Sequence, residues 1–294
     1  MKAVKIISAV TALCICFLSF CACGINKTAL TVNSTPVSEE VFGYFLSVAE
    51  NSYNYTDDKN KQKLAKELCA EYVAGEEMIK KYSIELSAEE KVVVSSEVKA
   101  NWQMYSDFYK KYSVSKQTLC EILEHESLIN SLVKFLYGAD GERALSEQEV
   151  KAFFNANYLA AKTAFTPFDA QMSESEIKKI TDNYSTMATS VRSGGSFASA
   201  VEQFPDMAES EDNAHIISAF DTSYPDGLFK KVAQGKNGET MVLRYSTGIY
   251  LVQRVDSSEY YDMYRSECIV KMKKDYVLGE IKAAAQSYKV EAVG

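Results

Sequence analysis

Apolar residues recur at the spacing of an α-helix through most of the first half of the chain. This spacing predicts four helices, which begin at Ser38 and run over residues 59–82, 87–112 and 115–137. Ser38 and Ser87 are predicted N-caps, because a serine hydroxyl can accept a hydrogen bond from the first helical turn. One strand-like segment, residues 28–33, precedes the helices, and the neighbouring sequence offers it no partner strand. The first half is therefore predicted to be helical apart from this strand.

The pattern changes after Leu145, where short helices alternate with extended segments. Extended segments are predicted over residues 159–168, 214–220, 240–245 and 249–255. With the intervening helices, the predicted order is strand, helix, helix, strand, helix, strand, strand. A long helix, 259–286, then leads to a last strand-like segment, 288–293. We expect this segment to pair with the opening strand, because an unpaired strand of this kind promotes aggregation.

The first residues have the composition of an export signal. Two lysines precede an apolar run, 6–20, which is shorter than the roughly 20 residues of a membrane-spanning helix. Cys23 lies beyond this run between Ala22 and Gly24, and this group resembles the lipobox of bacterial lipoproteins, whose cysteine carries lipid. The resemblance implies a signal peptide over residues 1–22, lipidation of Cys23 and anchoring at the extracytoplasmic face of the cell membrane. An ordinary secretory signal is the alternative.

The composition limits which partners the protein can bind. Hydrophobic residues make up 47% of the chain, which is enough for a packed core, and the net charge is −8. An acidic chain has no basic face to displace the counterions of nucleic acid, so we expect no nucleic-acid partner. The chain has no histidine cluster, cysteine pair or phosphate loop of the required spacing, so we expect neither a metal nor a cofactor. His125, which lies between two glutamates on a predicted helix, is expected to face solvent.

Three short stretches and the order of elements resemble the SurA and PrsA type of extracytoplasmic foldase. The stretches are 31–40, 145–157 and 193–204, the last of which reads Ser-Gly-Gly-Ser-Phe-Ala-Ser-Ala-Val-Glu-Gln-Phe. In that family a parvulin domain is inserted into a helical chaperone lobe. The resemblance implies an α+β fold in which a helical lobe, 23–144, is closed by residues 257–294 around a parvulin-like β/α domain, 145–256. We expect residues 257–294 to pack on the lobe and not on the parvulin-like domain.

The parvulin resemblance also implies a position for the catalytic site. Parvulins accelerate rotation about the peptide bond before proline, and the family has histidines on the first and last strands of the domain. Here Thr163 or Ala164 stands at the first position and Tyr250 at the second. Asp206 falls near the family's Cys or Asp position, so Asp206 and Tyr250 are the candidate catalytic residues. His215 is interpreted either as a substitute for a lost imidazole or as a strand residue that is solvated or hydrogen-bonded locally.

Aromatic side chains are the candidate contacts for polypeptide clients. Trp102, Tyr105 and Tyr109 recur at helical spacing, and Phe165 and Phe220 lie on predicted strands. Such rings supply adaptable contact area for unfolded chains, although the same residues would also serve as ordinary core.

The leading functional hypothesis is a membrane-anchored foldase whose isomerase activity is weak or lost. Its expected partners are unfolded or nascent secreted polypeptides, and the lipid provides the contact with the membrane. The first alternative is an active peptidyl-prolyl isomerase with a rearranged site. The second alternative is a non-catalytic lipoprotein that binds one dedicated partner.

Overall fold

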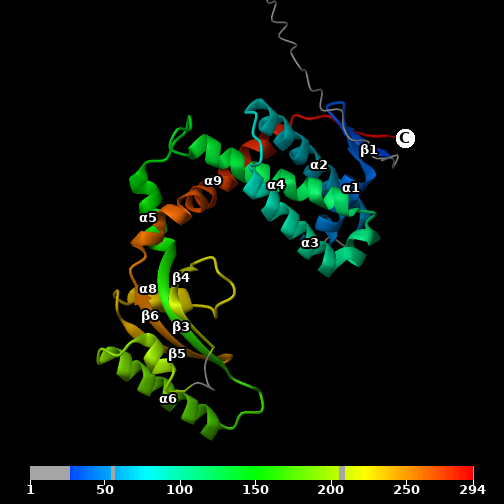
Figure 1. The fold of residues 1–294 in the computed structure, drawn as a ribbon. Helices are drawn as coiled ribbons and strands as arrows, with labels where there is room; N and C mark the ends of the chain where they lie inside the picture. The colour runs from blue at the N-terminus through cyan, green and yellow to red at the C-terminus, as the bar shows by residue number, and fades with distance from the viewer. Residues whose placement is uncertain (1–26, 54–56, 205–208, 294) are drawn as a thin grey trace, which may run out of the picture. The chain divides into compact units, whose positions relative to one another are not determined.

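The computed structural model describes residues 27–53, 57–204 and 209–293 of the chain (Figure 1). Two of the predicted site residues, Cys23 and Asp206, lie outside the described residues. Within the described ranges, no helix combines the length and the apolar character that are needed to cross a bilayer.

The chain divides into two compact units. The first, here called the helical unit, comprises the described parts of Met1–Met78, Ser87–His125 and Ile281–Gly294. The second, here called the α/β unit, comprises Ile79–Leu86 and Glu126–Glu280. Three long helices, α2, α4 and α9, have residues in both units.

The helical unit contains the helices that the sequence pattern predicts. Its elements are β1 (Thr28–Val32), β2 (Thr35–Ser38), α1 (Glu39–Asn51), α2 (Asp58–Lys81), α3 (Ala88–Lys111), the first part of α4 (Lys116–Tyr137) and β7 (Val290–Ala292). The Ser38 hydroxyl accepts a hydrogen bond from the backbone N–H of Val41, and Ser87 forms a capping box with Glu90. Both predicted N-caps are therefore confirmed.

A three-stranded sheet in the order β2-β1-β7 completes the helical unit. The predicted pairing of the two ends of the chain is confirmed, because β1 and β7 are antiparallel neighbours. The expectation that β1 lacks a nearby partner was wrong, since β2 follows it directly and pairs with it. Asn33 and Ser34 make this turn with φ of 44° and 69°. Pro36 thus belongs to β2, and helix α1 begins only after Ser38.

The α/β unit follows the predicted order of elements. Its elements are α5 (Glu147–Asn157), β3 (Tyr158–Pro167), α6 (Glu174–Arg192), α7 (Phe197–Val201), β4 (Glu209–Ser218), α8 (Leu228–Gln234), β5 (Thr240–Tyr245), β6 (Gly248–Val255), a short 3₁₀ turn (Ser258–Tyr260) and most of α9 (Tyr261–Ala285). The strands form one antiparallel sheet in the order β4-β3-β6-β5. Helices α6 and α7 pack on one face of this sheet and α8 packs on the other (Figure 1). The fold is α+β, as predicted.

Helix α9 differs from the expectation that residues 257–294 pack only on the helical lobe. Its first twenty residues belong to the α/β unit, where they contact α5 and β3. The Tyr158 hydroxyl donates a hydrogen bond of 2.9 Å to Glu267, and the rings of Phe154 and Tyr261 meet edge to face. Cys268 in the same helix is fully buried. These buried contacts are the physical reason why only the end of α9 and β7 belong to the helical unit.

Candidate functional site

A cleft whose lining includes three tyrosine rings lies on the α8 face of the sheet in the α/β unit. We call it the tyrosine cleft, and its volume is about 610 Å³. Its lining residues come from β3, the loop before α8 and the β5–β6 hairpin: Phe165, Thr222, Ser223, Tyr224, Pro225, Asp226, Tyr245, Ser246, Thr247 and Tyr250. The predicted site residue Tyr250 and the predicted contact Phe165 therefore share one cleft.

Tyr250 is the central ring of this cleft. It stands directly opposite Phe165 in the β3–β6 pairing, and the two rings stack with centroids 4.3 Å apart. The rings of Tyr224 and Tyr245 each lie 6.1 Å from the Tyr250 ring. Thr163 lies two positions before Phe165 and so shares its face of the sheet, whereas Ala164 belongs to the opposite core. Of the two residues at the position expected for the first histidine, Thr163 shares the face of the stacked aromatic pair and Ala164 does not.

Gly248 allows the Phe165 ring to sit against β6. A Cβ atom built on Gly248 would lie 2.8 Å from Cζ of Phe165 and closer still to Cε2 of that ring. It would also lie 2.5 Å from the carbonyl oxygen of Thr166, which the backbone pairing holds in place. The glycine is therefore required by close approach, and it fixes the position of the stacked pair.

His215 reaches the tyrosine cleft through a hydrogen bond. Its Nε2 atom lies 2.8 Å from the Tyr224 hydroxyl, and the imidazole ring stacks parallel to the Tyr224 ring. His215 is on β4, where it pairs with Ala161 of β3. The local hydrogen bond was one of the two sequence interpretations of this histidine, but its partner also forms a wall of the cleft. The structure thus brings one imidazole to the edge of the cleft.

Two phenol groups of the cleft, those of Tyr245 and Tyr250, are held in the neutral form. Burial raises the pKa of the Tyr250 hydroxyl, and burial together with the nearby Tyr250 raises the pKa of Tyr245. The Tyr245 hydroxyl is buried and has no hydrogen-bond partner among the described residues. The ammonium group of Lys231 lies 4.7 Å from the centre of the Tyr245 ring. The cleft can therefore hold an apolar or proline-containing segment by ring stacking and offer it neutral hydroxyl groups.

The other predicted contact residues lie outside the tyrosine cleft. Trp102 and Tyr109 stack in α3 of the helical unit with centroids 6.2 Å apart. Tyr105, between them, has non-helical backbone angles that kink the helix, and its side chain is 48% exposed. Phe220 of the α/β unit is 43% exposed and stacks on Phe153, but it does not line the cleft.

Sequence reasoning missed Tyr224 and Tyr245 and misplaced His125. Tyr224 lies in an irregular loop and Tyr245 at the end of a strand, where no periodic signal marks a wall of a cleft. The expectation that His125 faces solvent was wrong, because its ring packs 4.3 Å from that of Tyr72. Burial lowers the pKa of His125, while the charge of Glu76 and a hydrogen bond with the Tyr72 backbone oppose this effect.

Comparison with known proteins gives matches only among solved structures. No protein-family model and no curated protein matches the chain. The foldase PrsA from Streptococcus pneumoniae superposes with a TM-score of 0.45 at 15% identity, over 83% of this chain and 88% of that one. PrsA from Bacillus subtilis superposes with a TM-score of 0.38 at 14% identity, over 90% of this chain and 91% of that one. A SurA-like chaperone structure from Campylobacter jejuni gives a TM-score of 0.32 at 13% identity, over 92% and 100% of the two chains.

These solved structures belong to the class of foldases and chaperones that the sequence itself resembles. Their TM-scores lie below 0.5, so the likeness assigns no function to this chain. The function has to be argued from the residues of the tyrosine cleft and from the sequence.

Proposed function

We propose that the protein is a lipid-anchored extracytoplasmic foldase that binds unfolded or nascent secreted polypeptides, with little or no prolyl isomerase activity. The tyrosine cleft is the observation that carries this proposal. Four aromatic rings, those of Phe165, Tyr224, Tyr245 and Tyr250, converge on one cavity of about 610 Å³. That volume lies within the range of sites that hold small ligands, and here it would hold one or two side chains of an extended segment.

Binding by this cleft needs no particular client sequence. Aromatic rings contact any apolar or proline side chain through dispersion and burial, which are non-directional. The three tyrosines add hydroxyl groups that can meet the polar backbone of the client. A site of this kind suits a holdase that retains segments exposed before folding is complete.

Weak isomerase activity follows from the groups at the centre of the cleft. Catalysis requires stronger interactions with the twisted peptide bond than with the planar one. The stacked pair of Phe165 and Tyr250 occupies the sheet face where the resemblance implies imidazoles. General estimates of about 0.5–1.5 kcal/mol for each lost hydrogen bond imply that two losses slow the reaction by about one to two decades.

The hydrogen bond between His215 and Tyr224 favours a second candidate function, an active isomerase with a rearranged site. In that case the imidazole polarises the Tyr224 hydroxyl, which would stabilise the twisted peptide bond. The two candidates differ in what the Tyr224 hydroxyl does, because binding needs the ring and catalysis needs the hydroxyl group as well.

Two variants of Tyr224 separate these candidates. The full chain and its Tyr224→Phe and Tyr224→Ala variants are compared for suppression of client aggregation and for isomerisation of a proline-containing peptide in a protease-coupled assay. The foldase proposal expects Tyr224→Phe to retain suppression and Tyr224→Ala to weaken it, with isomerisation near background in all three proteins. The control is Tyr276→Ala, which removes a tyrosine ring that is 59% exposed and does not line the cleft.

Each contrary outcome points to a different function. Isomerisation at a high rate that Tyr224→Phe abolishes supports the rearranged isomerase and refutes the degenerate site. Absence of both activities in the unaltered chain places the dedicated-partner alternative first.

The proposed membrane anchor rests on the sequence around Cys23. Ala22 and Gly24 flank this cysteine at the end of an apolar run, which supports Cys23 as the lipidated residue. We expect Cys23→Ser to release the protein from the membrane fraction and Cys21→Ser to leave it attached. The opposite result would assign the lipid to Cys21.

A further inference from the structure

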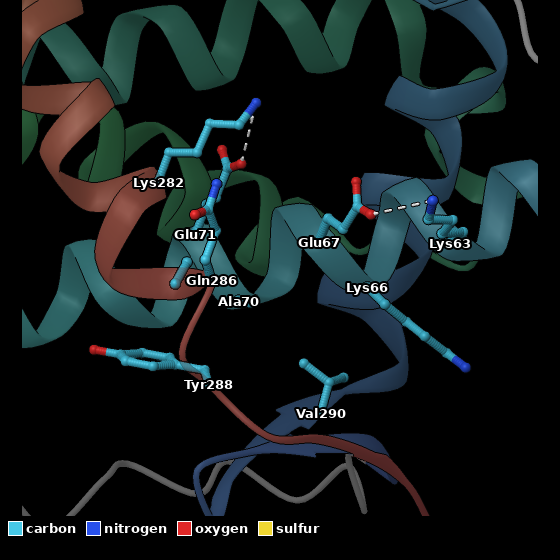
Figure 2. Close-up of a pocket in the computed structure, with 10 residues that line it drawn as sticks. Lys63, Lys66, Glu67, Ala70, Glu71, Lys282, Gln286, Tyr288 and Val290 are labelled. Atoms are coloured by element: carbon cyan, nitrogen blue, oxygen red, sulfur yellow. Dashed lines mark ion pairs between the residues drawn. The ribbon is translucent and has the colours of Figure 1, made fainter.

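A second cavity lies in the helical unit, beside the edge strand β7. It has a volume of about 490 Å³, and we call it the edge pocket. Figure 2 shows side chains of α2 on one side of it and Tyr288 and Val290 on the other. Its lining residues are Lys63, Lys66, Glu67, Ala70, Glu71, Lys282, Ala285, Gln286, Tyr288 and Val290. The pocket thus combines an apolar floor with a charged rim.

The charged rim of the edge pocket has an excess of one positive charge. Three lysines and two glutamates line it, and two of the lysines are paired (Figure 2). Lys282 lies 3.8 Å from Glu71, and Lys63 lies 3.9 Å from Glu67. The structure gives Lys66 no ion-pair partner among the described residues. Lys66 is therefore the cation available to an incoming carboxylate.

The backbone of β7 offers hydrogen-bonding groups at its outer edge. The Val293 N–H donates to the Ala29 carbonyl, and the Lys289 carbonyl accepts from Asn33, so alternate residues of this segment face β1. In an antiparallel pair the intervening residues turn their N–H and C=O groups the other way. Those residues are Val290 and Ala292, and no other described strand pairs with them. The sheet can therefore accept one more strand beside β7.

The charged side chains of this edge point away from the edge pocket. Val290 and Ala292 stand opposite Val32 and Leu30, which are buried in the core, and Val290 lines the pocket. Glu291 alternates with them and so lies on the other face of the sheet. Natural edge strands are commonly protected by charges, but on the pocket side this edge presents only the small or apolar side chains of Val290 and Ala292.

We propose that the edge pocket and the outer edge of β7 together bind an extended polypeptide segment that carries an acidic residue. The segment adds as a fourth strand beside β7, and its backbone bonds to Val290 and Ala292. One of its carboxylates reaches Lys66, and a neighbouring apolar side chain contacts Ala70 and Val290. The excess positive charge selects an acidic segment, although the chain as a whole is acidic. This site is separate from the tyrosine cleft and does not depend on the function proposed for that cleft.

Two fluorescein-labelled peptides test this proposal by fluorescence anisotropy with the full chain. One is Thr-Val-Glu-Val-Thr, and the other has lysine in place of glutamate. We expect the acidic peptide to bind more tightly, and Lys66→Glu to weaken its binding about tenfold, since one charge-assisted contact becomes a repulsion. The control Lys91→Glu makes the same change of charge at an exposed position of α3 outside the pocket, and it should leave binding unchanged.

Strand addition is tested separately at Ala292. Ala292→Pro removes the outward N–H without removing a hydrogen bond to β1, and we expect binding of the acidic peptide to weaken about tenfold. Ala292→Ser retains the N–H and should bind normally. Circular dichroism of each variant checks that the helical unit remains folded.

Three results would overturn the proposal. Equal binding of the acidic and basic peptides would remove the role of Lys66. Binding that is lost in Lys66→Glu but retained in Ala292→Pro would identify an anion pocket without strand addition. A concentration-dependent dimer in sedimentation that Ala292→Pro abolishes would show that the edge pairs two copies of this chain. Because the tyrosine cleft is tested by Tyr224 variants, a failure here leaves the proposed function standing.

Discussion

Removal of β7 tests whether the end of the chain holds the helical unit together. A chain that stops after Gln286 retains the whole of α9, which ends at Ala285, and loses Tyr288 and β7. The truncation leaves the α/β unit unchanged in sequence. It also leaves the free edge of β1 uncovered, so Leu30 and Val32 lose the neighbours opposite them.

The hydrogen bonds that the truncation removes set the size of the expected effect. The Asn33 N–H donates to the Lys289 carbonyl at 3.0 Å, and the Lys289 N–H donates to the Asn33 side chain at 3.0 Å. The Tyr288 hydroxyl donates to Glu77 at 2.5 Å, and the Val293 N–H donates to Ala29 at 3.2 Å. At about 0.5–1.5 kcal/mol each, these four bonds contribute about 2–6 kcal/mol to the free energy of unfolding, and the backbone pairing of β7 with β1 adds to this. Since they are largely exposed, we expect a loss near the lower end, about 3 kcal/mol.

Trp102 provides a signal that is specific to the helical unit. It is the only tryptophan of the chain, and it stacks on Tyr109 within α3. Urea unfolding followed by tryptophan fluorescence therefore reports on this unit alone. With a slope of about 2 kcal/mol per molar urea, a loss of about 3 kcal/mol lowers the midpoint by about 1.5 M.

The matched control for the truncation is Glu291→Ala. This change removes a side chain of β7 whose ion pair with Lys289 is exposed, and it retains every backbone hydrogen bond of the strand. Exposed ion pairs contribute about 0–1 kcal/mol, so the midpoint should barely move. A truncated chain that unfolds at the same urea concentration as the full chain would refute a stabilising role of β7.

Three further predictions concern single side chains. Gly248→Ala should lower the free energy of unfolding of the α/β unit by about 1–3 kcal/mol, because the added methyl group would overlap Phe165 and the Thr166 carbonyl of β3. Calorimetry measures this loss. The half-buried His125 has a pKa lowered by burial, so its neutral form stabilises the helical unit above its unfolded pKa near 6.5. This stability is lost as the pH falls. Trp102 fluorescence should therefore show the helical unit weakening between pH 7 and 5, and His125→Phe, which keeps the ring packed on Tyr72, should reduce that dependence. Arg192→Met should lower the free energy of unfolding by about 1.5–3 kcal/mol in a thermal melt, because the guanidinium donates hydrogen bonds of 2.7 and 3.1 Å to the Thr240 carbonyl oxygen of β5. Arg192→Lys should recover only part of this loss.

Elements that depend on local sequence could be predicted, and elements that depend on a turn or on packing could not. The caps at Ser38 and Ser87 were readable because a serine hydroxyl acts within the first helical turn, and at Ser87 a glutamate three residues later completes a capping box. Strand β2 was missed because it has four residues and contains Pro36, which also suits the start of a helix. Its turn uses two residues with positive φ that are not glycine, so the usual turn signal is absent.

The candidate site was only partly readable for the same reason. Tyr250 was found because a resemblance gave its position, while Phe165 became its partner through the register of β3 and β6. Tyr224 joins them from a loop, and no spacing rule connects a loop residue with a strand residue far along the chain. The position of His125 was misjudged because its neighbours in sequence are charged, whereas its neighbour in space is Tyr72.

The arrangement around Tyr250 explains how the sheet packs without the imidazoles that the resemblance implies. Tyr250 is part of the apolar core between the sheet and α8, where Leu228 and Val232 are fully buried. A stacked pair of rings at this position buries apolar surface on both strands, which stabilises the sheet whether or not a client is bound. A histidine pair would instead place polar nitrogens there, and each would require a hydrogen-bond partner. One imidazole lies at the edge of the cleft, where His215 meets Tyr224. The imidazole thus lies at the wall of the cleft and not at its centre, so the Tyr224 hydroxyl is the group that separates the two proposed functions.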